Sequence, residues 1–276
     1  MLPFRLSLQP SNLPMINQIK SLLFKVLKID GYLTIIQKIY LTAFWAGLLK
    51  NNPSYKWHYF VQRLLKSGDT VIDIGTNLGY FTTQFAEKVK AGGHLYCVEP
   101  VQPFQKQLKK LITGKPNVTL LPYALGEEND KKVTLGIPTE FQKLGYLRHG
   151  TTTLLHNSNS ADGKHSFEAT MKKGSELFAN LSKLDYIKCD IEGYETVVFP
   201  EMKSVIEKYQ PIVQLETWGE QLMTMHDFFK GLGFAAFYLE KEKLYPLQSK
   251  PQARWGESDI LFVPCSKQER IAPFLG

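Results

Sequence analysis

The segment "TVIDIGTNLGYFT", residues 70–82, decides the fold of this 276-residue chain. Its first half is an apolar run around Asp73, which predicts a buried strand. Gly75 and Gly79 bracket the turn that follows, and the pattern over 79–90 predicts a helix. A strand, a glycine-bounded turn and a helix in this order raise the question of which ligand the turn is built to bind.

Strand-like and helix-like runs alternate along the rest of the chain. The expected strands are 70–75, 94–99, 117–122, 131–137, 165–171, 185–190, 211–216, 234–239 and 258–263, and the expected helices are 79–90, 103–112, 193–209 and 219–231. This alternation predicts an α/β fold, a mostly parallel sheet with helices on both faces. Ligands of such sheets bind beyond the carboxyl ends of the strands, so residues that end strands are site candidates.

Acidic residues stand at four of these strand ends: Asp73, Glu99, Asp190 and Glu216. A single acid at such a place is ordinarily a helix cap or a solvated loop residue. Four at equivalent positions of one parallel sheet converge on one cleft, so we expect at least two of them to contact a ligand.

The turn itself distinguishes between adenosine-containing ligands. A dinucleotide-binding turn reads G-x-G-x-x-G, whereas here Asn77 occupies the middle position. Asparagine tolerates a positive φ angle and adds an amide, which suits a ligand with ammonium and carboxylate groups better than a pyrophosphate. Glu99, 20 residues after Gly79, is placed to accept hydrogen bonds from ribose hydroxyls. A ligand that joins an amino-acid end to an adenosine end is S-adenosylmethionine.

Four stretches carry a family resemblance: "VIDIGTNLGYFTTQFA", "LYCVEPVQPFQKQL", "LPYALGE" and "LDYIKCDIEGYETVVF". In their order and spacing over about residues 70–263 the chain resembles the FkbM-type methyltransferases. The resemblance implies a class I methyltransferase, Rossmann-like fold and transfer of a methyl group from S-adenosylmethionine to a hydroxyl oxygen, commonly on a sugar or a polyketide. One departure is the absence of the family's frequent Thr-Leu-Asp before the strand at 185–190, which bears on the acceptor side of the site.

The resemblance also assigns donor-binding residues. They are Asp73, Gly75, Asn77 and Gly79 on the methionine side, Glu99 at the ribose, Ala124 and Leu125 beside the adenine, and Asp190 where the donor methyl group should lie. "DIEGYE", residues 190–195, resembles the family signature after the fourth core strand.

Methyl transfer to an oxygen requires alignment of the nucleophile and removal of its proton. Asp190 is the first candidate for the general base or for orienting the acceptor, and Glu192 is the second. Histidines are further candidates, namely His149, His156, His165 and His226, and the first three border a polar segment over 138–164 that could cover the substrate. Alternatively, Asp190, Glu192 and Glu216 could hold Mg²⁺. Tyr146, Tyr194 and Trp218 are candidates for stacking on an acceptor.

The basic charge of the chain is N-terminal. Residues 1–66 hold nine Lys or Arg and one acid, Asp30, while the other 210 residues hold 24 bases and 25 acids. The pattern predicts a basic amphipathic helix over residues 15–29 and a second, more apolar helix over 32–49. A break between the two helices is predicted at Asp30-Gly31. This region fits a helical cap on the catalytic domain, a membrane-surface patch or a membrane span. A span is disfavoured because Lys38 at mid-bilayer costs roughly 2.5–3.5 kcal/mol.

Composition bounds the remaining expectations. A chain that is 43% apolar can bury a large core, which predicts an N-terminal helical cap over 1–66 and one methyltransferase domain over 67–276. Three cysteines without metal-ligand spacing and the lack of a secretion signal indicate the cytoplasm, with peripheral membrane association left open. The expected partner is a small-molecule or glycan acceptor, and no nucleic-acid recognition motif accompanies the basic charge. The competing functions are an NAD-dependent oxidoreductase and a non-catalytic protein that binds an adenosyl ligand or a membrane surface.

Overall fold

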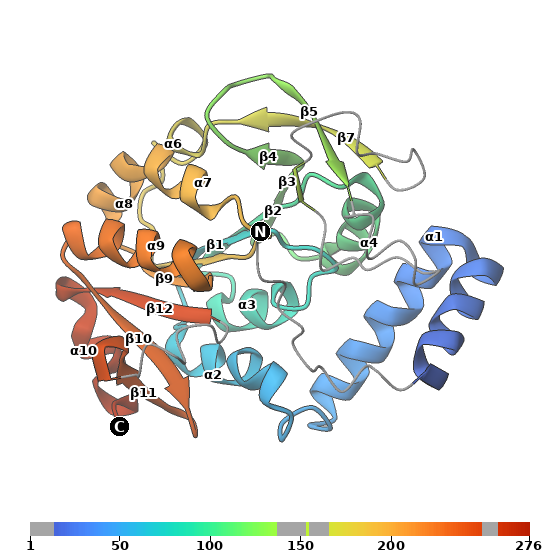
Figure 1. Cartoon of the computed structure of the whole chain (residues 1–276), viewed down its shortest axis with the longest axis horizontal. Coiled ribbons are helices and arrows are strands. Elements are labelled where there is room, and N and C mark those ends of the chain that lie inside the picture. The colour runs from blue at the N-terminus through green and yellow to red at the C-terminus, as the bar shows by residue number, and fades with distance from the viewer. Residues whose placement is uncertain (1–13, 137–152, 155–165, 250–258) are drawn as a thin grey trace.

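The computed structural model describes residues 14–136, 153–154, 166–249 and 259–276. At its centre lies an eight-stranded sheet in the order β11-β10-β12-β9-β8-β1-β2-β3 (Figure 1). In chain order these strands are β1 (Thr70–Ile74), β2 (His94–Val98), β3 (Val118–Leu121), β8 (Tyr186–Cys189), β9 (Ile212–Glu216), β10 (Phe234–Glu240), β11 (Lys243–Pro246) and β12 (Asp259–Pro264).

The sheet is parallel from β3 through β2, β1 and β8 to β9. The strands β12, β10 and β11 continue it in antiparallel pairing. All five residues of β1 are buried, as the central strand of a sheet covered on both faces requires. The predicted mostly parallel sheet is therefore confirmed, and its acids at strand ends share one edge.

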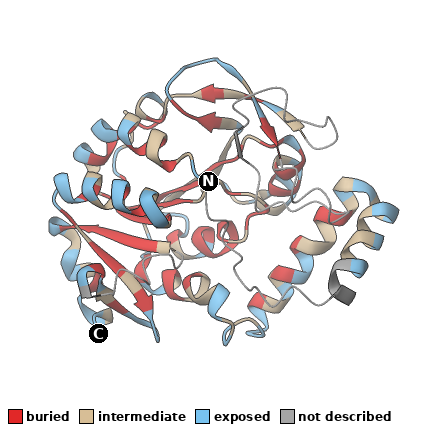
Figure 2. Cartoon of the chain, in the orientation of Figure 1, coloured by how far each residue is buried: buried red, intermediate tan, exposed pale blue. Residues whose placement is uncertain are grey.

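Helices cover both faces of the sheet, and Figure 2 shows that their buried residues face inward. One face packs on α2 (Lys56–Leu64) and α3 (Thr82–Val89) through Phe60, Phe85 and their neighbours. The other face packs on α7 (Glu195–Glu201), α8 (Lys203–Tyr209) and α9 (Gly219–Gly231). The described residues also form α4 (Gln102–Ile112), α6 (Gly174–Leu177) and α10 (Gln268–Ile271).

The prediction of a single helix over 193–209 is wrong in detail. The structure divides it into α7 and α8 at Met202, whose ψ angle of 9° is not helical. Pro200 lies two residues earlier and lacks the amide hydrogen that a continuous helix needs.

A second sheet was not expected from the sequence. It has the order β4-β7-β5-β6 and comprises β4 (Tyr123–Leu125), β5 (Lys132–Gly136), β6 (Thr153–Leu154) and β7 (Ser166–Lys172). The strands predicted at 131–137 and 165–171 exist, but they pair antiparallel with each other here instead of joining the main sheet. Their alternation of apolar and polar residues is typical of antiparallel strands with one covered face.

The N-terminal helix α1 (Pro14–Trp45) has a kink at Lys28, whose φ angle is 54°. The break expected at Asp30-Gly31 is therefore displaced by two residues. Gly31 lies within the helix after the kink, where a Cβ atom would approach the Cβ of Leu27 to 3.0 Å. Within the described residues, no helix has both the length and the apolar character that crossing a membrane requires.

The second limb of α1 packs on the domain beside the turn that follows β1. Gln37 is buried, and its Nε2 donates to the carbonyl oxygen of Leu78 at 2.7 Å. Thr34 Oγ1 donates to Gln107 Oε1 on α4 at 2.9 Å. Tyr32 and Leu33 are fully buried in the cluster that includes Leu78 and Phe104. This helix therefore supports the loop that carries the candidate site.

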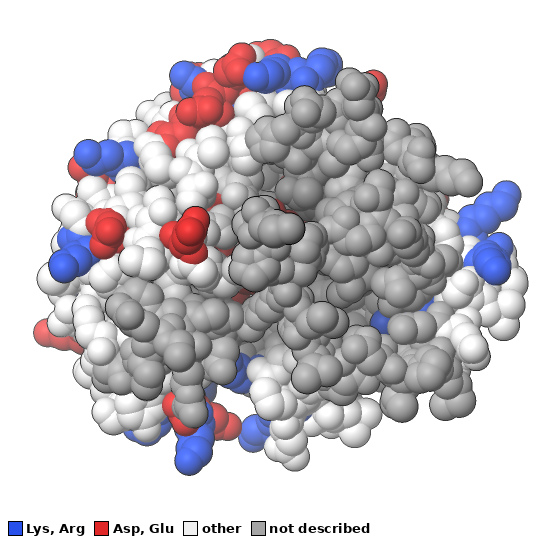
Figure 3. Space-filling model, in the orientation of Figure 1, with Lys and Arg blue, Asp and Glu red and all other residues white. Residues whose placement is uncertain are grey.

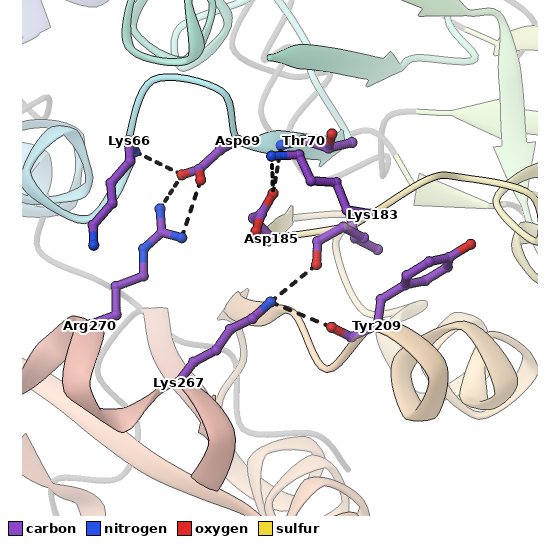
Figure 4. A network of polar contacts seen from close by, with 9 residues as sticks. Lys66, Asp69, Thr70, Lys183, Asp185, Tyr209, Lys267 and Arg270 are labelled. Carbon is purple, nitrogen blue, oxygen red and sulfur yellow. Dashed lines mark hydrogen bonds and ion pairs between the residues drawn. The ribbon is translucent and has the colours of Figure 1, made fainter. Parts of the chain in front are cut away.

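A polar network joins the C-terminal helices to the opposite, amino edge of the sheet (Figure 4). Asp69 accepts an ion-pair hydrogen bond from Arg270, and the Asp69 carboxylate also accepts from the amide of Lys66 at 2.7 Å. Lys267 donates to the carbonyl oxygen of Tyr209 at 3.4 Å. Asp185 accepts from the amide of Thr70 at 2.9 Å. These polar groups connect elements of the fold at the amino edge, whereas the candidate site residues lie at the carboxyl edge.

Candidate functional site

The turn between β1 and α3 is held against the ends of β2 and β8. The amides of Gly75 and Thr76 both donate to the carbonyl oxygen of Val98, at 3.0 and 3.2 Å. Gly75 has a φ angle of 76°, and a Cβ built there would lie 1.9 Å from the carbonyl oxygen of Asp190. Glycine is required because the backbone after β8 occupies the space of a side chain. Asn77 has a φ angle of 54°, as its residue type favours.

Glu99 is fixed by this turn. Its Oε2 accepts from the amide of Asn77 at 2.6 Å, and its Oε1 accepts from the amide of Val101 at 2.8 Å. The side chain is buried, and burial raises the pKa of Glu99 to about 7, although the two amide bonds favour the charged form. Each carboxylate oxygen keeps a second lone pair, so Glu99 can accept two further hydrogen bonds from a diol.

A pocket of about 670 Å³, counted with its open mouth, lies at the carboxyl edge of the sheet. Seven of the residues predicted for the site line it: Gly75, Asn77, Glu99, Ala124, Leu125, Asp190 and Glu192. Apolar side chains of Val101, Phe104 and Leu135 complete the wall next to Glu99. The second sheet contributes Ala124 and Leu125 from β4 and Leu135 from β5, which explains why these segments matter although they are outside the main sheet.

Two of the predicted donor residues lie outside the pocket lining. A Cβ at Gly79 would lie 2.6 Å from a methyl carbon of Leu111 and 2.8 Å from one of Leu108, so this glycine lets the turn pack closely on α4. Asp73 is buried in β1, and its carboxylate oxygens have no hydrogen-bond partner among the described residues. Burial raises the pKa of Asp73 to about 6, opposed by the charge of Lys188. Donor contact by either residue stays a prediction.

Asp190 stands at the pocket rim directly after β8. Its Oδ2 accepts from Lys188 Nζ at 3.0 Å; the Lys188 side chain is 5% exposed and that of Asp190 34%. Burial opposes ionisation of Asp190, but the Lys188 charge outweighs it and the pKa of Asp190 lies below its usual value. The charge of Asp190, together with burial, raises the pKa of Glu216 well above its usual value. The negative charge of the pair therefore resides on Asp190 in preference to Glu216.

Lys188 is buried near other buried polar side chains that the sequence analysis did not single out. Gln214 Nε2 donates to Asp259 Oδ2 at 2.9 Å, and Tyr186 donates to Gln214 Oε1 at 2.6 Å. Burial raises the pKa of Asp259 to about 6, with the Lys188 charge opposing. A lysine inside the apolar strand "YIKCD" is a usable signal, because a buried charge needs a partner.

Glu195 was also missed as a site residue. It is buried, and its carboxylate accepts from the amides of Ile191 at 2.9 Å and Gly193 at 3.0 Å. Gln221 of α9 donates to the same carboxylate at 2.7 Å. Glu195 thus fixes the turn that carries Asp190, and the signal was the last acid of "DIEGYE".

The histidines predicted as bases do not enter the described site. His149, His156 and His165 fall outside the described residues, as does Tyr146. His226 lies on α9 next to Asp227, at 3.4 Å. The sequence analysis did not single out His58 on α2, whose ring stacks on Phe81 with 4.1 Å between ring centroids. Burial first, and then the Lys188 charge, lower the pKa of His58 to about 3, so its imidazole is neutral.

The predicted magnesium site finds no support. Among the described residues, no three carboxylate, imidazole or thiol groups converge as metal ligands would. Glu216 does not line the pocket that Asp190 and Glu192 share. The physical reason is that the Asp190 carboxylate already has a cation, the Lys188 ammonium group. Of the predicted aromatic residues, Tyr194 lines the pocket and Trp218 precedes α9.

The chain resembles known proteins in its sequence and in its fold. A domain model described as the methyltransferase FkbM domain matches residues 73–237. No curated protein matches the chain. Similar solved structures include the methyltransferase FkbM from Methylobacillus flagellatus, with 12% identity, a TM-score of 0.47, and coverage of 91% of this chain and 60% of that one. A precorrin-6y C5,15-methyltransferase from Geobacter metallireducens has 9% identity, a TM-score of 0.42 and coverage of 74% and 84%. A SAM-dependent O-methyltransferase from Thermotoga maritima has 13% identity, a TM-score of 0.41 and coverage of 76% and 65%.

The parallel sheet with its antiparallel edge and the pocket at its carboxyl end define a class I, S-adenosylmethionine-dependent methyltransferase fold. The matched domain covers more than half of the chain, which therefore belongs to the FkbM methyltransferase family. This membership removes the NAD-dependent oxidoreductase from the competing functions. The chain spans 60% of the length of the M. flagellatus FkbM structure.

Replacing Glu99 by glutamine should weaken donor binding by roughly 1.5–3 kcal/mol, the range for lost hydrogen bonds to a charged group. Since burial raises the pKa of Glu99 to about 7, protonation below that pH should weaken donor binding to the wild type, by about fivefold from pH 7 to pH 6. The variant should show no such pH dependence. Calorimetric titration of both proteins, with the exposed Glu240→Gln as control, measures this. An unchanged affinity in folded Glu99→Gln would remove Glu99 from the donor site.

Proposed function

We propose that the chain transfers a methyl group from S-adenosylmethionine to a hydroxyl oxygen of a sugar, glycan or other small natural product. The observation that carries this proposal is one pocket lined both by Glu99 and by Asp190. The first residue suits the ribose of the donor. The second suits a hydroxyl group that must lose its proton.

The residues on the Glu99 side of the pocket fit the donor. Glu99 accepts from the ribose hydroxyls, and Val101, Phe104 and Leu125 offer apolar surface to the adenine. Gly75 and Asn77 line the pocket and suit the methionine end, because the Asn77 amide group can donate and accept hydrogen bonds. When bound, the donor supplies an electrophilic methyl group on a positively charged sulfur.

Asp190 is the residue that prepares the acceptor. Lys188 keeps its carboxylate ionised, so Asp190 accepts a hydrogen bond from the acceptor hydroxyl and orients that oxygen. A carboxylate is a weak base, but the hydroxyl becomes strongly acidic as its oxygen bonds to the methyl group, and Asp190 then takes the proton.

The acceptor class is supported by the composition of the pocket rim. Tyr194 and Glu192 line the pocket together with Asp190. An aromatic ring beside two carboxylates offers a stacking surface and hydrogen-bond acceptors, which suits a polyhydroxylated ring. The proposed reaction therefore joins a polyhydroxylated acceptor to the donor.

The experiment that tests this function is a transfer assay with methyl-labelled donor and a panel of sugars, glycans and hydroxylated natural products. We expect S-adenosylhomocysteine to form and mass spectrometry to locate the label on an acceptor oxygen. Label on nitrogen or carbon of a better acceptor would contradict hydroxyl specificity. Donor binding with no turnover on any nucleophile would instead favour a non-catalytic binding protein.

A further inference from the structure

Exposed apolar side chains concentrate on the N-terminal arm, which we define as Pro14–Lys50. Of the eight large apolar side chains exposed in the described part of the chain, six lie on this arm. They are Ile19, Leu22, Val26, Ile39, Trp45 and Leu48, with exposed fractions of 50%, 63%, 70%, 61%, 49% and 76%. The catalytic domain contributes Met223 and Leu275.

The first limb of α1 has two apolar faces. Ile19, Leu22 and Val26 follow the spacing i, i+3, i+7, so they form one outer stripe on the helix. Leu23 and Phe24 pack inward against the core cluster beneath the arm. A helix that covers a soluble domain should instead be polar on its outer face.

The neighbouring helix α4 provides that contrast within the same molecule. Its exposed residues are Gln102, Lys106, Lys109 and Lys110, all of them polar. The apolar outer stripe of α1 therefore distinguishes it from α4, the helix beside it.

Positive charge accompanies the apolar stripe. Lys20 and Lys25 flank it on the helical surface, and Lys28, Lys38 and Lys50 are exposed further along the arm. The single acid of residues 1–66, Asp30, pairs with Lys106 at 3.4 Å. Figure 3 shows lysine or arginine atoms on the side of the molecule where Figure 1 places α1.

We propose that the N-terminal arm docks on an anionic phospholipid surface. Ile19, Leu22 and Val26 enter the boundary between headgroups and acyl chains, and the lysines contact lipid phosphates. Lysine stems reach past apolar surface while the ammonium groups stay with the headgroups. Trp45 is a residue type that favours the membrane interface. A second copy of this chain would carry the same positive charge, which opposes self-association through this face.

Vesicle flotation of the full chain tests this proposal. We expect binding to vesicles of phosphatidylglycerol and phosphatidylcholine, little binding to phosphatidylcholine alone, and a marked loss of binding at high salt. Leu22→Gln combined with Val26→Gln should reduce binding at least tenfold, and Lys25→Glu combined with Lys28→Glu should do the same. The matched control is Met223→Gln, which removes a side chain that is 53% exposed on α9 and should bind as the wild type does.

Melting temperature and donor titration of each variant should stay at wild-type values, because the substituted side chains point away from the core and the pocket. Absence of binding to anionic vesicles would overturn the proposal, as would equal binding by the arm variants and the wild type. A concentration-dependent dimer that Leu22→Gln with Val26→Gln abolishes, without vesicle binding, would assign the face to a second copy instead. None of these outcomes depends on methyl transfer.

Discussion

Asp190→Asn should lower turnover by about 10²- to 10⁴-fold, the usual contribution of a positioned acid or base. The amide keeps the size of the carboxylate and can still accept from Lys188, but it cannot take a proton from the acceptor. Donor affinity should stay nearly unchanged because Glu99 and the glycine turn are intact. Steady-state kinetics and donor titration on the same preparation measure both quantities.

Two neighbouring carboxyl groups provide matched controls. Glu216→Gln should cost less than about tenfold in turnover, because Glu216 does not line the pocket and its raised pKa favours the neutral form, which an amide resembles. Glu192→Gln should likewise leave most of the activity. A stable, fully active Asp190→Asn enzyme would remove Asp190 from the mechanism, and a large loss confined to Glu192→Gln would transfer its role to Glu192.

Gly75→Ala should abolish donor binding within the measurable range and lower turnover by about 10²-fold or more. A Cβ at this position would lie 1.9 Å from the carbonyl oxygen of Asp190, so the ends of β1 and β8 must separate. The left-handed backbone adds a strain of about 1–3 kcal/mol. The variant therefore disturbs the donor turn and the acceptor carboxylate at the same time.

The control variant Gly114→Ala separates the effect of backbone strain from the effect of a steric clash. Gly114 has a φ angle of 78°, close to the 76° of Gly75, but nothing lies within 4 Å of a Cβ built there. It should lose stability through backbone strain and keep wild-type affinity and turnover per folded molecule. If both variants behave alike in thermal melting and in donor titration, the close approach of Gly75 to β8 has no functional role.

The central strands and the Glu99 side of the pocket could be predicted because local pattern dictates them. The run around Asp73 is apolar enough to read as a buried strand, and the left-handed Asn77 follows from residue type. Glu99 could be placed from its distance to the turn. These features depend on residues within one strand-turn-helix unit or on the regular spacing of such units.

The second sheet and the pairing of Asp190 depend on long-range contacts, which the sequence does not express locally. β7 pairs with β5 and with β4, so Ala124 and Leu125 reach the pocket through a partner about 45 residues away. His58 falls in the predicted N-terminal cap, and only the structure shows that its helix packs on the sheet core beside Phe81. The charge of Lys188 was visible, but its pairing with Asp190 required the structure.

The most direct test of the account is calorimetric titration of the full chain with S-adenosylhomocysteine and, separately, with NAD. The product of the donor avoids turnover and retains the ribose, adenine and amino-acid groups that the pocket is inferred to bind. We predict one S-adenosylhomocysteine site per chain, weakened by Glu99→Gln, and no measurable binding of NAD at the same concentrations. Binding of NAD with comparable or higher affinity, or S-adenosylhomocysteine binding that Glu99→Gln and Gly75→Ala leave unchanged, would contradict the assignment of this pocket.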